Sequence, residues 1–173
     1  MSTLILFSGG VESTAMLGLA QPGDRLLSVA PVYERDIQLV ARKALKIANY
    51  YGMAIERASL LMKRPPMQMW ELSSIASAFV AGDSSITAVW WGMNKDDVNA
   101  LQQDSYDRVT AAWPLAHPTV PLTAPLRHLS KLEQWNMIPD EIKPHVHTCI
   151  LHYVCGECRK CQERIEAGIP LVV

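Results

Sequence analysis

A glycine-containing segment near the N-terminus has the residue types of an anion-binding loop. Four apolar residues at 4–7 run into Ser-Gly-Gly at 8–10, and a helix is predicted over residues 12–20. The N–H groups of a first helical turn lack partners within the helix, and the positive end of the helix dipole adds to their attraction for an anion. The glycines let the backbone approach a bulky anion, and the hydroxyls of Ser13 and Thr14 add donors. These residues predict a phosphate-binding loop, and a plain strand-to-helix turn is the alternative interpretation.

A second group of residues with metal-binding chemistry lies near the other end of the chain. The four cysteines are Cys149, Cys155, Cys158 and Cys161. Their spacing is C-x5-C-x2-C-x2-C, and four thiolates so close together can surround one tetrahedral ion, with Gly156 providing the tight turn. A site closed by four thiolates leaves no coordination position for water. We therefore predict a structural zinc ion (Zn²⁺) that holds residues 145–168 together.

An iron–sulfur cluster is the alternative occupant of the same cysteines, because C-x2-C-x2-C also occurs in ferredoxin-type sequences. No cysteine follows three residues after Cys161, which weakens that interpretation. His145, His147 and His152 lie close by in the sequence as substitute ligands, although surface or substrate-pocket positions suit them better when four cysteines are present. Four unrelated thiols are the remaining interpretation.

A third polar segment, residues 92–97, follows a predicted strand at 86–91 and includes Asp96 and Asp97. Their carboxylates could cap the helix that follows. They could equally reach a substrate, or a magnesium ion (Mg²⁺) that bridges the phosphates of ATP. The residues alone leave both interpretations open.

The elements that must position these groups alternate between strands and helices. Strands are predicted at 4–7, 26–30, 54–61 and 86–91, and helices at 12–20, 36–51, 70–81, 98–113, shortly after Ser130, and at 160–167. This order is typical of an α/β fold with a doubly wound parallel sheet covered on both faces. Ligands bind at the carboxyl ends of such strands, so the loops after Phe7, Ala30 and Trp91 should converge on one site. An extended crossing is predicted where prolines recur, at Pro114, Pro118, Pro121 and Pro125.

Composition is typical of a soluble globular protein with one domain at 1–173 and residues 145–168 as a C-terminal cysteine knuckle. Of the 173 residues 49% are hydrophobic and 19% charged, and the formal net charge is −1. This balance argues against nucleic acid as the main partner, because binding the phosphate backbone needs a clustered excess of Lys and Arg. The sequence shows neither a membrane-length apolar run nor a signal-peptide pattern, so we expect a cytoplasmic protein with no membrane partner. In that compartment clustered cysteines favour metal binding or catalysis over disulfides.

The two ends of the chain together resemble a known family. The segment Phe-Ser-Gly-Gly-Val-Glu-Ser-Thr at 7–14 resembles the pyrophosphate loop (PP-loop), Ser-Gly-Gly-x-Asp-Ser, of the ATP pyrophosphatase superfamily. With the cysteine pattern it resembles the 7-cyano-7-deazaguanine synthase family. Further matching segments are Val29-x-x-x-Tyr33, Val40-Ala41-Arg42, Ala124-Pro125-Leu126 with Lys131, and Thr148-Cys149 leading to Cys161-x-x-Arg164.

That resemblance implies an adenine-nucleotide α-hydrolase-like, Rossmann-type fold and an ATP-dependent ligase of queuosine biosynthesis. Its substrates would be 7-carboxy-7-deazaguanine and ammonia, and adenylylation of the substrate would release pyrophosphate on the way to the nitrile, 7-cyano-7-deazaguanine. The resemblance assigns ATP binding to Phe7, Ser8, Gly9, Gly10, Val11, Glu12, Ser13 and Thr14. Taken together, the residues and the resemblance predict catalytic roles for Ser8, Glu12, Ser13, Asp97 and Arg164, and a metal held by the four cysteines. It leaves homodimerisation open.

The chain also departs from the family pattern. Glu12 stands where the family has Asp, and Tyr33-Glu34-Arg35 stands where the family has Tyr-Gly-Gln. Because Glu12 keeps the charge, we expect Glu12→Asp to be tolerated or to raise the rate. The alternatives to nitrile synthesis are a tRNA thiolase with an iron–sulfur centre, an enzyme that attaches the deazapurine to a protein, and a degenerate nucleotide-binding module.

Overall fold

Five parallel strands form one sheet in the computed structural model, which describes residues 1–31, 37–60, 68–96, 100–146 and 155–171. The strands are β1 Ser2–Leu6, β2 Arg25–Pro31, β3 Ile55–Leu60, β4 Ile86–Trp90 and β5 Leu122–Thr123. Their order across the sheet is β3-β2-β1-β4-β5, and every neighbouring pair is parallel. The chain runs outward from β1 through β2 to β3 and then returns to add β4 and β5 on the other side of β1. The predicted doubly wound parallel sheet is thus confirmed, with its topological switch between β1 and β4.

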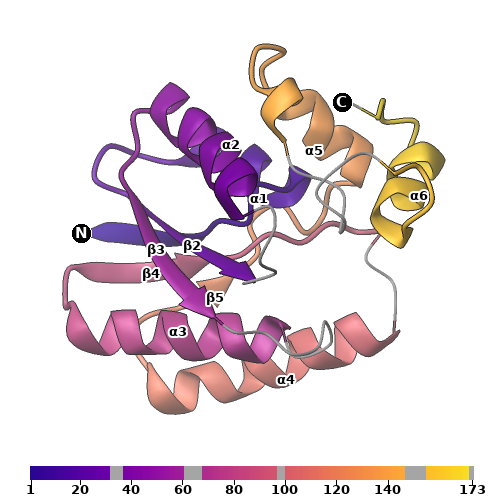
Figure 1. Ribbon diagram of the computed structural model, residues 1–173. Helices are drawn as coiled ribbons and strands as arrows, with labels where there is room; N and C mark the ends of the chain where they lie inside the picture. The colour runs from indigo at the N-terminus through magenta and orange to yellow at the C-terminus, as the bar shows by residue number, and fades with distance from the viewer. Residues whose placement is uncertain (32–36, 61–67, 97–99, 147–154, 172–173) are drawn as a thin grey trace.

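Helices cover both faces of this sheet (Figure 1). One face carries α1 Val11–Ala15, α2 Ile37–Tyr50 and α5 Lys131–Met137, and the other carries α3 Gln68–Gly82 and α4 Ala100–Ala116. Strand β1 contributes to both cores, because successive side chains of a strand point to opposite faces. Ile5 packs in the core under α1, α2 and α5, whereas Leu4 and Leu6 pack in the core against α3 and α4. Burial on both faces explains why the strand is a continuous apolar run.

The helix predicted over residues 12–20 consists of two pieces. Helix α1 ends at Ala15 and passes directly into a 3-10 helix, η1 Met16–Leu19. The change follows burial: Met16 and Leu17 are fully buried against the sheet, whereas Gly18 and Leu19 reach the surface. Such tight turns are common where a short helix ends.

The prediction around Pro114 was wrong. Helix α4 continues through Pro114 to Ala116, although a proline within a helix removes one backbone hydrogen bond. The last turn is held by other contacts: the N–H of His117 donates to the carbonyl of Trp113 at 2.9 Å, and the buried indole of Trp113 donates to the carbonyl of Val120 at 2.6 Å. The extended segment that follows includes the short strand β5, which the sequence did not indicate.

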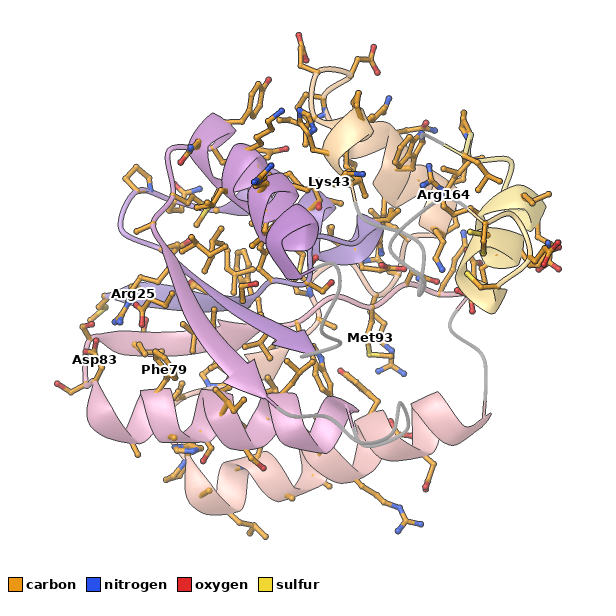
Figure 2. The ribbon with its side chains drawn as sticks, viewed as in Figure 1. Arg25, Lys43, Phe79, Asp83, Met93 and Arg164 are labelled. Carbon is orange, nitrogen blue, oxygen red and sulfur yellow. The ribbon has the colours of Figure 1, made fainter. Side chains whose placement is uncertain are left out.

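Ion pairs stabilise the edge of the sheet at which the strands begin, which is the edge opposite the glycine loop. Arg25 pairs with Glu56 on β3 and with Asp83 before β4, and Figure 2 shows Arg25 and Asp83 far from Met93 at the opposite edge. Hydrogen bonds from Ser85 and from the Arg25 guanidinium lower the pKa of Asp83 to about 2. These pairs fix the strand ends that face away from the candidate site.

Two C-terminal helices complete the described structure. Helix α5, predicted shortly after Ser130, begins with a capping box: the N–H of Glu133 donates to the Ser130 hydroxyl at 3.1 Å, and the N–H of Ser130 donates to the Glu133 carboxylate at 2.6 Å. These bonds, together with Lys95, lower the pKa of Glu133 to about 2. Helix α6 spans Arg159–Glu166, and Gly168 follows it with φ 70°, as predicted for its C-terminal stop. In the described part of the chain, no helix combines the length and the apolar character that a membrane span requires.

Candidate functional site

The glycine loop lies at the carboxyl end of β1, the central strand of the sheet. The N–H of Phe7 donates to the carbonyl of Leu27 at 2.9 Å, so pairing with β2 continues to the edge of the loop. Gly9 then takes φ 75°, a conformation that costs other residues energy, and it is buried. Gly10 is the extended residue that begins α1, and no side chain caps the helix there. Gly10 therefore has no side chain that competes with an anion for the N–H groups of the first turn.

Ser13 holds the loop in shape. Its buried hydroxyl accepts a hydrogen bond from the N–H of Ser8 at 3.2 Å and lies 3.1 Å from the Ser8 hydroxyl. It also lies 3.3 Å from the carbonyl of Gly10, to which it donates. Because these contacts link both ends of the loop, Ser13 fixes where the backbone N–H groups point.

Some of the residues assigned to ATP binding have side chains exposed to solvent, and others are buried. Ser8 is exposed and Glu12 partly so. Phe7, Val11 and Thr14 are buried, and among the described residues the Thr14 hydroxyl has no hydrogen-bond partner. These three side chains support the loop from the core.

The loop after β4 meets the glycine loop, as predicted for the segments that follow Phe7 and Trp91. The amide of Asn94 donates to the Glu12 carboxylate at 2.9 Å, and the Asn94 side-chain oxygen accepts from the N–H of Asp96 at 2.8 Å. The same prediction included the segment after Ala30, which falls largely on residues 32–36 and so lies outside the described residues. Asp97 also lies outside the described residues.

Gly92 allows this close approach. A Cβ atom at Gly92 would lie 2.8 Å from the Glu12 Cβ and 2.9 Å from the Ser13 nitrogen. Ordinary contacts are longer, and the second of these neighbours is backbone, so the first turn of α1 would have to move.

We therefore expect Gly92→Ala to weaken ATP binding about tenfold or more while the protein stays folded, at a cost of about 1–3 kcal/mol in the free energy of unfolding. Calorimetric titration with ATP and a thermal melt measure the two effects. Gly82→Ala is the matched control, because a Cβ at Gly82 meets nothing within 4 Å. Equal ATP affinity in both variants would contradict the packing argument.

A buried lysine joins the glycine loop to the C-terminal helix. The Lys131 side chain is 7% exposed, and its ammonium lies 2.8 Å from the Glu163 carboxylate and 3.4 Å from that of Glu12. Its backbone N–H donates to the Asp96 carboxylate at 2.8 Å. A buried ammonium must have such partners to offset its loss of hydration. Sequence reasoning noted Lys131 only as a family match and did not single out Asn94 or Glu163.

These contacts revise the expectation for Glu12→Asp. The longer Glu12 side chain reaches both Asn94 and Lys131, and an Asp carboxylate stands one methylene farther back. We now expect Glu12→Asp to lower kcat/KM for ATP by about tenfold, since hydrogen bonds to a charged group are worth about 1.5–3 kcal/mol. Steady-state kinetics of AMP release measure the change. An unchanged or higher rate would restore the expectation from the family pattern.

Three of the predicted metal ligands come together. The Sγ atoms of Cys155, Cys158 and Cys161 all lie within 4.8 Å of one another, and those of Cys155 and Cys161 are 3.9 Å apart. Gly156 adopts φ 73°, as expected for the tight turn. The N–H of Cys158 donates to the Cys155 sulfur at 3.2 Å. Cys149, His147 and His152 lie outside the described residues.

The sulfur spacing fits a single ion. Thiolates about 2.3 Å from one zinc ion lie about 3.8 Å apart in a tetrahedron. Thiolates that each bind a different iron of a four-iron cluster lie roughly 6 Å apart. The 3.9 Å between the Cys155 and Cys161 sulfurs matches the smaller arrangement, and every separation among the three is below the larger one.

Arg164 is buried near Cys161 and is not exposed to solvent. It is 1% exposed, its guanidinium stacks on the Trp135 ring at 4.7 Å, and it donates to the carbonyl of Pro170. Burial lowers its pKa, and the negative charge of Cys161 opposes that shift. A buried cation beside the thiolates offsets part of their negative charge.

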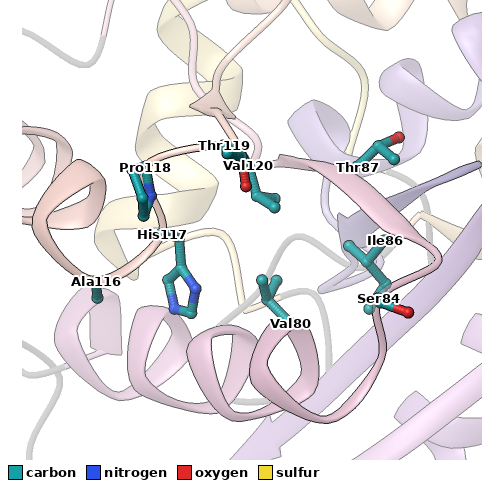
Figure 3. Close-up of a pocket in the computed structure, with 9 residues that line it drawn as sticks. All are labelled: Val80, Ser84, Ile86, Thr87, Ala116, His117, Pro118, Thr119 and Val120. Carbon is teal, nitrogen blue, oxygen red and sulfur yellow. The ribbon is translucent and has the colours of Figure 1, made fainter.

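A cavity of about 380 Å³ lies elsewhere, at the amino end of β4 (Figure 3). It is bordered by Val80, Ile86 and His117. The ring of His117 lies 2.6 Å from the Ser77 hydroxyl. None of the loop residues or cysteines borders it, so it does not belong to the candidate site.

Comparison with known proteins shows that the chain shares its fold with a solved structure. No protein-family model matches the chain, and no curated protein matches its sequence. Among solved structures the chain is similar to the U34-tRNA thiolase NcsA from Methanococcus maripaludis with its [4Fe-4S] cluster, with a TM-score of 0.58 and 17% identity. The match covers 96% of this chain but only 64% of that structure. At this identity the likeness establishes that the two proteins share a fold.

Proposed function

We propose that this protein is an ATP-dependent enzyme that adenylylates the carboxylate of 7-carboxy-7-deazaguanine and, with ammonia, converts it to 7-cyano-7-deazaguanine. One observation carries the proposal: Lys131 brings the glycine loop and the cysteine-bearing helix together at the carboxyl edge of the sheet. These contacts support the proposal that the two motifs that resemble this family form one site. The shared fold with a tRNA thiolase supports the broader assignment to PP-loop enzymes that use ATP.

The reaction explains what the loop would do. A carboxylate is a poor electrophile because its charge repels nucleophiles and its oxygen is a poor leaving group. Transfer of AMP to that oxygen removes both faults, and ammonia then displaces AMP to give the amide. A second adenylylation, on the amide oxygen, allows loss of AMP to give the nitrile. N–H groups fixed by Gly9, Gly10 and Ser13 would stabilise the charge on departing pyrophosphate.

The cysteines would hold zinc as a structural ion. Cys155, Cys158 and Cys161 supply three ligands at suitable spacing, and Cys149 is the proposed fourth. Zinc in a closed site of four thiolates supplies folding energy rather than a reactive water. The carboxylates of Glu12 and Asp96 are the groups that would hold Mg²⁺, which would offset negative charge on the phosphates of ATP.

A second candidate is sulfur transfer to tRNA by an iron–sulfur enzyme. Two observations favour it: the structural neighbour is a tRNA thiolase with a [4Fe-4S] cluster, and three cysteines are gathered in this chain. Metal analysis and a visible spectrum of anaerobically purified protein separate the candidates. Colourless protein with one zinc per chain supports nitrile synthesis, and a brown protein containing iron and sulfide supports the thiolase.

The proposal is tested by mass spectrometry of protein incubated with ATP, Mg²⁺, ammonium and 7-carboxy-7-deazaguanine. We expect the nitrile and two AMP per nitrile, and no product when ATP is omitted. Omitting ammonium should stop the reaction before the amide. ATP binding without AMP or nitrile at saturating substrate would instead indicate a nucleotide-binding module.

A further inference from the structure

We propose that Glu12, Lys131 and Glu163 act as a positioning bridge through which the metal-bound cysteine helix sets the geometry of the glycine loop. This inference rests on the proposed function only for the identity of the ligand in the loop. The metal, on this account, does more than stabilise the C-terminal segment: it controls how well the loop is formed.

The bridge spans elements that are far apart in the sequence. Glu12 is in the first turn of α1, Lys131 is the first residue of α5, and Glu163 is on α6. The Lys131 ammonium contacts both carboxylates, at 3.4 Å and 2.8 Å. Figure 1 shows α1, α5 and α6 on the same side of the molecule, with α5 between the other two.

Burial gives the contacts their strength. The side chains of Glu12, Lys131 and Glu163 are 18%, 7% and 20% exposed, so water and salt screen their interaction weakly. Two carboxylates share one ammonium, which offsets their mutual repulsion. If Glu163 moves away, Lys131 is drawn towards Glu12, which competes with the 2.9 Å bond from Asn94 to Glu12.

The cysteines control where Glu163 lies. Glu163 follows Cys161 by two residues within α6, and Cys158 is the residue that begins this helix. Helix α6 has eight residues, which is too few for a stable isolated helix. A metal held by the cysteines would therefore fix α6, and with it the Glu163 carboxylate. Loss of the metal should reach the glycine loop through Lys131.

The test is amide hydrogen exchange of the peptide covering residues 7–15, with and without a strong zinc chelator and without ATP. In the parent protein, chelation should speed exchange of this peptide about tenfold. In Glu163→Gln the peptide should already exchange about tenfold faster, and chelation should add less than about twofold, because the two changes act through one link. Glu166→Gln, an exposed carboxylate on the same helix, should behave as the parent.

Lys131 provides a second pair of variants. Lys131→Met keeps the length of the side chain but removes the charge, and it should uncouple the loop from the metal as Glu163→Gln does. Lys131→Arg keeps a cation between the carboxylates and should restore at least part of the coupling. If Lys131 had only a structural role, both variants would be less stable, but the response of the loop to metal removal would not change.

ATP affinity supplies the functional readout. Chelation should raise the dissociation constant for ATP about tenfold in the parent and in Glu166→Gln, but less than about twofold in Glu163→Gln. The positioning bridge is overturned if chelation leaves the 7–15 peptide unchanged in the parent, or if Glu163→Gln keeps the parental response. If exchange follows the bridge while ATP does not bind, the bridge stands and the proposed function fails.

Discussion

Replacing Gly9 with alanine is expected to reduce ATP-dependent AMP release at least about 100-fold while the protein remains folded. Gly9 has φ 75°, where a Cβ atom clashes with the backbone, so alanine must strain or rearrange the loop. The rearrangement displaces N–H groups that would stabilise the departing pyrophosphate, and loss of one such donor costs about 10²–10³ in kcat. Quenched-flow or steady-state measurement of AMP gives the rate, and circular dichroism reports the fold.

A substitution at a second glycine is the control that separates the effect of backbone strain from the loss of anion binding. Gly23 also has positive φ, at 96°, and a Cβ there meets nothing within 4 Å in a turn away from the site. Gly23→Ala should lose about 1 kcal/mol of stability, as Gly9→Ala should, and keep the parental rate. If the two variants have the same activity, the backbone of the glycine loop does not hold the anion.

Removing the metal is expected to lower the melting temperature by at least about 5 °C, since a change of 1 kcal/mol corresponds to about 2–4 °C for a chain of this size. Chelated protein and Cys158→Ser should both show the effect, because each breaks the site that holds α6. Amides of residues 155–169 should gain exchange first, before those of the sheet.

Differential scanning calorimetry, combined with metal analysis of each sample, measures this effect. Ser84→Ala, an exposed position at the other end of the molecule, is the control and should melt as the parent. A melting temperature independent of metal content would mean that the cysteines do not stabilise the C-terminal segment.

The sequence predicted local features better than it predicted the contacts that join them. The strand before the glycine loop, the turn at Gly156 and the helix after Ser130 each depend on residues close together in the chain, and the structure confirms them. The strand β5 has only two residues, too few for a periodic signal. Helix α4 passes Pro114 because contacts of Trp113 compensate for the lost bond, which no local rule predicts.

The contacts of Lys131 could not be derived from spacing, since its partners lie at positions 12, 96 and 163. One signal was nevertheless present. Lys131 directly follows the N-cap residue Ser130, at the positive end of a helix dipole, where a cation is unfavourable. A lysine in that position predicts nearby carboxylates, and the structure supplies them from Glu12 and Glu163.

The most direct test of the central claim follows the oxygen atoms of the substrate. Protein is incubated with ATP, Mg²⁺, ammonium and 7-carboxy-7-deazaguanine labelled with ¹⁸O in both carboxylate oxygens, and AMP is examined by mass spectrometry. Adenylylation transfers one carboxylate oxygen to each of two AMP molecules, so we predict AMP carrying a single ¹⁸O, two per nitrile, with unlabelled pyrophosphate. Release of ADP, or of AMP without the label, would contradict adenylylation of the carboxylate at this site.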